Sequence, residues 1–88
     1  MGRIIVTVGS VTTAARLEKL LRKNKGIYSR VIHTPATLNA GGCSHSVVLE
    51  GKYLSQLKEL SNKYGLTIRK IYMEEIYNGE KMYHVISG

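Results

Sequence analysis

The sequence has no aspartate and only one cysteine and one proline, Cys43 and Pro35. A lone cysteine cannot form a disulfide within the chain, which fits a reducing cytoplasm. The six glutamates are the only acidic side chains, and none of them lies between residues 19 and 49. Because no carboxylate is available near the cysteine, a catalytic triad cannot be assembled there. We therefore expect a protein that binds or carries a ligand, and not an enzyme.

Long apolar runs are also missing. No segment approaches the ~20 consecutive apolar residues of a membrane span. The apolar start of the chain, at residues 4–6, is too short for a signal peptide. There are no internal repeats, linkers or low-complexity stretches. These features predict a single cytoplasmic domain over residues 1–88, near the lower size limit for a fold with one hydrophobic core.

Basic side chains outnumber acidic ones by 13 to 6, which gives a net charge of +7 at pH 7. Such a surplus fits a nucleic acid, an anionic partner or only a soluble surface. The basic residues are spread along the chain, with the densest cluster at 22–25, and form no arginine-rich arm. The six tyrosines lack the spacing typical of RNA-binding sheets. RNA binding is therefore the third of the functions that we consider.

Hydrophobic periodicity and turn residues predict five strands and two helices. Ser10, Thr12 or Thr13 is expected to cap the first helix, which ends at Gly26. The Asn78-Gly79 pair predicts a type I′ hairpin turn. In chain order the expected elements are strand 3–8, the helix up to Gly26, strand 27–34, one helical turn at 35–38, strand 45–50, helix 52–64, strand 66–77 and strand 81–86.

This order, βαββαβ followed by one more strand, predicts an α+β, ferredoxin-like split βαβ fold with an extra C-terminal hairpin strand. Right-handed crossovers place both helices on one face of the sheet. Period-two counting puts Ile5, Tyr28, Ile32 and Val48 on the other face. That set is too large to face water, so we expect a homo-oligomer formed through this face or through the terminal hairpin.

The most unusual stretch runs from His33 to Ser46, between the second and third strands. It holds the only proline, the only cysteine, two of the three histidines and a glycine pair. Residues 35–44 are long for a hairpin loop, and long loops in small domains tend to be functional. The working residue that we expect is Cys43. The candidate binding residues around it are His33, Thr34, Pro35, Gly41, Gly42, Ser44 and His45.

A reactive thiol is the first chemistry that fits. Backbone N–H groups of a glycine turn, with no carboxylate to oppose them, would lower the pKa of the Cys43 thiol below its ordinary value of ~8.5. The thiolate could then carry sulfur or selenium as a persulfide or selenosulfide. A cysteine that only fills a small gap at a strand end is an equal alternative.

Metal binding by Cys43, His45 and His33 is a second possibility, although their spacing is not a standard chelating pattern. Anion binding in a backbone nest at Gly41 and Gly42 is a third. The sequence matches no phosphate-binding loop or dinucleotide fingerprint, so no cofactor is expected.

Four residues of this stretch resemble the motif of a small bacterial family of selenium/sulfur carrier-like proteins. Thr34 and Pro35 are followed by Leu38, and then by Cys43 at the start of a strand. Members of that family typically read Pro-Thr-Pro-Arg, Leu-Ser, a short gap and Cys-Gly, whereas this chain has His33, Ala36, Asn39 and Ser44 at the other positions. The resemblance extends over residues 4–73.

The resemblance implies a small carrier or sensor of sulfur or selenium species that acts through Cys43 and hands its cargo to a partner enzyme. The alternative is a regulatory or adaptor module that binds a metal, a small anion or a protein at the same loop. Cys43 would be exposed and reactive in the first case and dispensable in the second.

Overall fold

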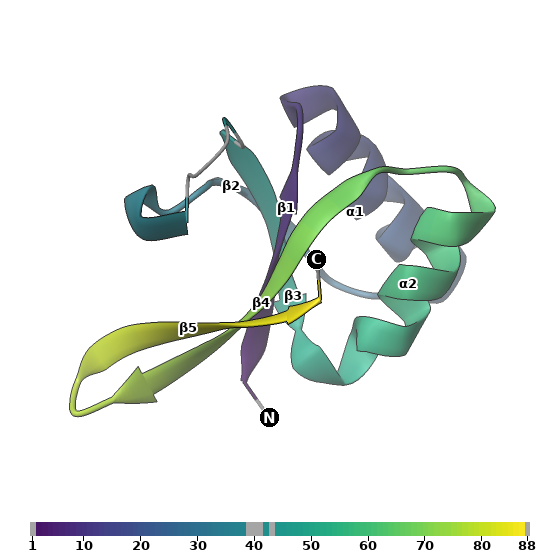
Figure 1. The fold of residues 1–88 in the computed structure, drawn as a ribbon. Helices are drawn as coiled ribbons and strands as arrows, with labels where there is room; N and C mark the ends of the chain where they lie inside the picture. Colours follow the sequence, from purple (N-terminus) through teal and green to yellow (C-terminus); the bar gives the residue numbers. More distant parts are fainter. Residues whose placement is uncertain (1, 39–41, 43, 88) are drawn as a thin grey trace.

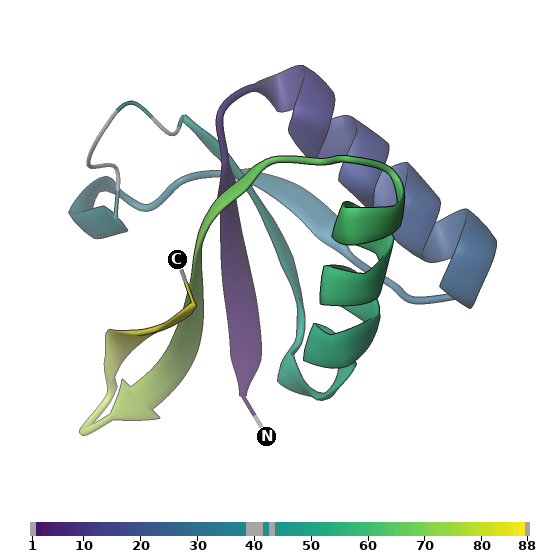
Figure 2. The same ribbon diagram turned by 45° about the vertical axis from the view of Figure 1, so that its right-hand side comes forward.

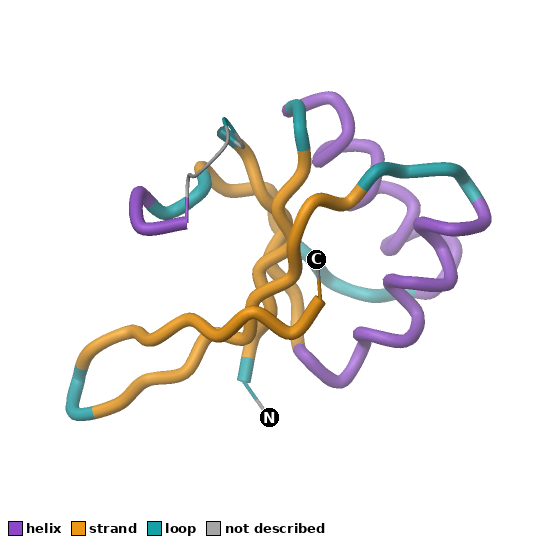
Figure 3. The backbone as a smooth tube through the Cα atoms, in the orientation of Figure 1, coloured by secondary structure: helices purple, strands orange, loops and turns teal. Residues whose placement is uncertain are grey.

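The structure, a computed structural model, describes residues 2–38, 42 and 44–87. It contains a five-stranded sheet, two α-helices and two short 3-10 turns (Figures 1 and 3). Within the described residues, no helix is both long and apolar enough to cross a membrane. The elements are β1 (Arg3–Val8), α1 (Val11–Lys25), β2 (Arg30–His33), η1 (Ala36–Leu38), β3 (His45–Glu50), η2 (Gly51–Tyr53), α2 (Leu54–Lys63), β4 (Ile68–Tyr77) and β5 (Glu80–Ser87).

The strands lie in the order β2-β3-β1-β4-β5, and every neighbouring pair is antiparallel. The first four strands have the order of a ferredoxin-like fold, and β5 adds to the free edge of β4. Both helices cover one face of the sheet, whereas η1 lies on the opposite side (Figures 1 and 2). The fold predicted from the sequence is confirmed.

The central strand β1 is buried on both faces, because all five residues from Ile4 to Val8 are at most 2% exposed. Ile4, Val6 and Val8 point toward the helices and join the larger core cluster. The other buried members of that cluster are Ala14, Leu17, Leu21, Ile27, Val47, Leu49, Leu57, Leu60 and Ile71.

Most of the helix caps and turns predicted from the sequence are found at the predicted residues. The Ser10 side chain accepts a hydrogen bond from the backbone N–H of Thr13, and α1 ends at Gly26 in the left-handed conformation. Asn78 and Gly79 both have positive φ, at 51° and 79°, as a type I′ turn requires. Strands β1 and β3 have the predicted bounds.

Two predicted strands were too long at their starts. The second begins at Arg30 and not at residue 27, because the N–H of Ile27 bonds the carbonyl of Leu21 and completes the end of α1. Similarly, the N–H of Leu66 bonds the carbonyl of Ser61 at the end of α2, so β4 begins only at Ile68. Both segments serve as helix ends and cannot also join the sheet.

The face of the sheet opposite the helices is largely covered within the chain, so Ile5 and Val48 need no second copy to be shielded from water, and the homo-oligomer stays a prediction. Ile5 is 1% exposed and Val48 is 7% exposed. They form a second cluster with Leu38, from the turn before the cysteine, and Tyr72, against which Ile32 and Tyr83 also pack. Burial raises the pKa of the Tyr83 phenol, and the nearby Glu74 carboxylate adds to this shift. Only Tyr28 projects freely into solvent.

Leu38 connects the candidate loop to this second cluster, so its truncation tests that link. We expect Leu38→Ala to lower the free energy of unfolding by about 2 kcal/mol, since a largely buried side chain is replaced by a cavity. Urea denaturation measures the change, with Thr37→Ala at the exposed neighbouring position as the control, expected within about 0.5 kcal/mol of the wild type. Equal effects of the two substitutions would contradict this role of Leu38.

Candidate functional site

The predicted site lies at the end of the sheet where β2 stops and β3 starts (Figure 1). The structure describes six of its eight candidate residues, and Gly41 and Cys43 lie outside the described residues. Gly42 has a φ of +81°, a conformation that favours glycine. The residues on both sides of Cys43 are exposed.

Thr34 and Ser46 hold together the two strands from which the loop extends. The N–H of Thr34 bonds the carbonyl of Ser44 at 3.0 Å, which extends the β2–β3 pairing by one residue. The hydroxyl groups of Thr34 and Ser46 lie 2.6 Å apart, and both residues are buried. The two hydroxyl groups therefore form a hydrogen bond with each other, so neither is left without a partner in this buried position. Thr34 is thus a structural support for the loop.

The loop then turns sharply at Pro35. The N–H of Leu38 bonds the carbonyl of Pro35 at 2.8 Å and closes the short turn η1. This turn directs Leu38 into the second cluster, where it contacts the sheet. The chain is consequently held at Thr34 and Leu38 on one side of Cys43 and at the start of β3 on the other.

His33 and His45 are brought together. They are paired across β2 and β3, and their ring centroids are 4.9 Å apart with the planes tilted by 39°. Nδ1 of His45 lies 3.0 Å from the Ser44 hydroxyl. His33 is exposed and His45 is half-buried, so both rings are accessible beside the loop. Among the described residues, no group of three potential metal ligands is found, and two histidines alone are an incomplete site.

The N-terminus of a helix lies at this end of the sheet. The end of β1 pairs with the start of β3, Val8 opposite His45, and α1 begins three residues after Val8. The N-terminus of α1, which carries the positive end of the helix dipole, therefore lies at the same end of the sheet as the loop. Its first turn holds no acidic residue.

A comparison with protein families matches residues 3–73 to the family described as "Putative Se/S carrier protein-like". The chain belongs to this family. The match includes the whole loop, both histidines and the two helices, and it ends within β4. The resemblance read from Thr34, Pro35, Leu38 and Cys43 is thus confirmed at the level of the family. Neither a curated protein nor a solved structure matches the chain.

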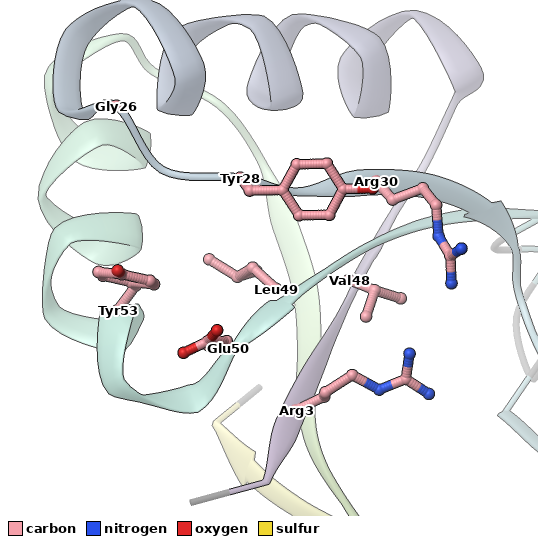
Figure 4. Close-up of a pocket in the computed structure, with 8 residues that line it drawn as sticks. All are labelled: Arg3, Gly26, Tyr28, Arg30, Val48, Leu49, Glu50 and Tyr53. Atoms are coloured by element: carbon pink, nitrogen blue, oxygen red, sulfur yellow. The ribbon is translucent and has the colours of Figure 1, made fainter.

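Sequence reasoning missed a pocket of about 410 Å³ at the other end of the family-matched sheet. Figure 4 shows Arg3 and Arg30 extending on either side of Val48, with Tyr28 and Tyr53 nearby. Nε and Nη2 of Arg3 also donate to Oε1 of Glu74. The lining residues come from separate elements and form no motif. The only signal in the sequence is that Tyr28 and Arg30 are two residues apart in the predicted second strand, which places them on the same face.

A double-mutant cycle tests the Thr34–Ser46 contact. We expect Thr34→Val to lower the free energy of unfolding by about 1–2 kcal/mol, because it leaves the buried Ser46 hydroxyl without its partner. Adding Ser46→Ala should cost little more, since no unpaired hydroxyl then remains. Thermal or urea unfolding of the two single variants and the double variant measures the coupling. Strictly additive losses would show that the hydroxyl groups do not depend on each other.

Proposed function

We propose that this protein carries or senses sulfur or selenium species on the thiol of Cys43 and hands them to a partner enzyme. The membership of residues 3–73 in a carrier-like family is the observation that supports this best. The geometry is compatible with it, because the strands and the turn η1 fix both ends of the loop while the flanking residues stay exposed.

The proposed loading step transfers one sulfur atom without an external oxidant. The Cys43 thiolate attacks the outer sulfur of a persulfide, R–S–SH, on a donor protein. A sulfur–sulfur bond forms to Cys43, the donor's own sulfur–sulfur bond breaks, and R–S⁻ leaves with the bonding electron pair. Cys43 then holds a persulfide, Cys43–S–SH, and an acceptor enzyme removes the outer sulfur by the same type of attack. A selenium atom would be held in the same way, as a selenosulfide.

The surrounding residues would favour the thiolate over the thiol. Backbone N–H groups at Gly41 and Gly42 are positioned in sequence to donate to it, and the N-terminus of α1 adds positive potential at this end of the sheet. A protonated His45 or His33 would add to the same effect. Pro35 and Ser44 would set the path of the loop, while Thr34 anchors it.

The reactivity of Cys43 tests the proposal directly. We expect iodoacetamide to alkylate the folded protein with a midpoint below that of a free peptide thiol, about pH 8.5, because positive potential lowers the pKa of the thiol. Mass spectrometry after incubation with a low-molecular-weight persulfide should show one added sulfur. Cys43→Ser is the control for both measurements and should show neither reaction. A midpoint at or above that of the peptide would contradict the carrier function.

A second candidate function, the binding of a metal by a regulatory module, is favoured by one observation. His33 and His45 stand with their rings 4.9 Å apart on neighbouring strands. Cys43 is adjacent in sequence and would supply a third ligand. The chain lacks the nearby carboxylates that usually orient metal-bound histidines, so we place this function second.

Substitution of His45 separates the two functions. If the thiol works alone, His45→Ala should raise the alkylation midpoint by removing a neighbouring positive or partly positive charge, and zinc should not protect Cys43. If a metal is bound, His45→Ala and Cys43→Ser should each abolish binding in a calorimetric titration with zinc or nickel. A stoichiometric, sub-micromolar site lost in both variants would replace the carrier by the metal-binding module.

A further inference from the structure

The hairpin formed by β4 and β5 is the most apolar exposed part of the described chain. Seven large hydrophobic residues are strongly exposed, and five of them lie on this hairpin. The pairing of β1 with β4 ends at Glu74, so the following residues of β4 have only β5 beside them. Figure 3 shows this ribbon extending away from the helices and the rest of the sheet. The five exposed residues are Ile76, Tyr77, Met82, Val85 and Ile86.

The charge of this segment differs from that of the rest of the chain. Residues 74–88 hold three glutamates and one lysine, a net charge of −2, whereas residues 1–73 hold 12 basic and three acidic residues, a net charge of +9. Two copies that meet through their basic bodies would repel each other. Two copies that meet through their hairpins bring together a net charge of only −2 from each segment, so the repulsion there is much weaker. Because a two-fold axis pairs identical edge strands with each other, the occupant that the hairpin fits best is a second copy of the same chain.

The backbone of β5 offers a pairing edge for such a copy. In a hairpin with a two-residue turn, the closing pair, here Tyr77 and Glu80, exchanges hydrogen bonds within the hairpin. The register is regular from there to Val85, so alternate residues of β5 direct their N–H and carbonyl groups away from β4. These residues are Lys81, Tyr83 and Val85. β5 is the last strand of the sheet and contains no proline, so it lacks one common protection of an edge strand.

We propose that two copies of this chain pair their β5 strands antiparallel across a two-fold axis at Tyr83. This register places all three outward-facing residues opposite outward-facing partners: Tyr83 opposite Tyr83, and Lys81 opposite Val85 of the second copy. It forms a continuous ten-stranded sheet and covers Val85 and Met82. The inference does not depend on the carrier function, because it rests on β5 alone and β2, which leads into the cysteine loop, is the opposite edge strand of the sheet.

Charge substitutions at Val85 test the register. Val85→Glu should tighten the dimer and Val85→Lys should weaken it, because each places a charge opposite Lys81 of the other copy, twice per dimer. We expect dissociation constants that differ by about tenfold or more between the two variants. Sedimentation of the full chain from about 1 to 100 µM measures them, with the wild type expected at twice its mass of 9.8 kDa at the upper end.

The same two charges at Val11, which is half-exposed on α1, are the matched control for net charge. They should change the dissociation constant much less than those at Val85. Val85→Pro removes an outward N–H without breaking a bond to β4, and should weaken the dimer about 30-fold while circular dichroism stays unchanged. A monomer throughout the concentration range, or equal responses at Val85 and Val11, would overturn the proposal. Loss of the dimer would leave the alkylation of Cys43 unaffected, so the two proposals fail independently.

Discussion

Burial of β1 on both faces is the constraint on which the rest of the structure depends. The helices satisfy it on one side only, so Ile5 and its neighbours need a second cover. Among the residues that the structure describes, no third α-helix supplies that cover. The turn before the cysteine provides Leu38, and the C-terminal hairpin provides Tyr83. The loop before the cysteine and the C-terminal hairpin are thereby both attached to the core.

This arrangement attaches the candidate site to the core of the protein. The two ends of the loop are held by a buried pair of hydroxyl groups at Thr34 and Ser46, by the turn after Pro35 and by Leu38. The proposed carrier function would gain from such an attachment, because less conformational freedom is lost when a partner protein binds. The fold thus separates two tasks: the family-matched region holds the loop, and the segment after residue 73 extends the sheet.

Much of the fold could be predicted because its signals are local. The alternation in β1, the serine before α1 and the Asn78-Gly79 pair each act over a few residues. The failures were non-local. Ile27 and Leu66 continue an apolar strand pattern in sequence, yet their N–H groups complete helix ends. Leu38 is a single apolar residue in a loop, and no periodicity reveals that it covers Ile5. For the site, adjacent strands predicted the approach of His33 and His45, whereas the Thr34–Ser46 bond required the actual register.

The central position of β1 also has a consequence for how the chain reaches its folded state. Arg3 pairs with Glu50 on one side and Glu74 on the other, so β1 waits for partners that leave the ribosome much later. Until then, the apolar segment from Ile4 to Val8 has both edges unpaired and is prone to contacts with other nascent chains. Contacts of such long sequence separation slow folding. In the cell, protection of β1 during translation would therefore affect the yield of folded protein more than protection of either helix.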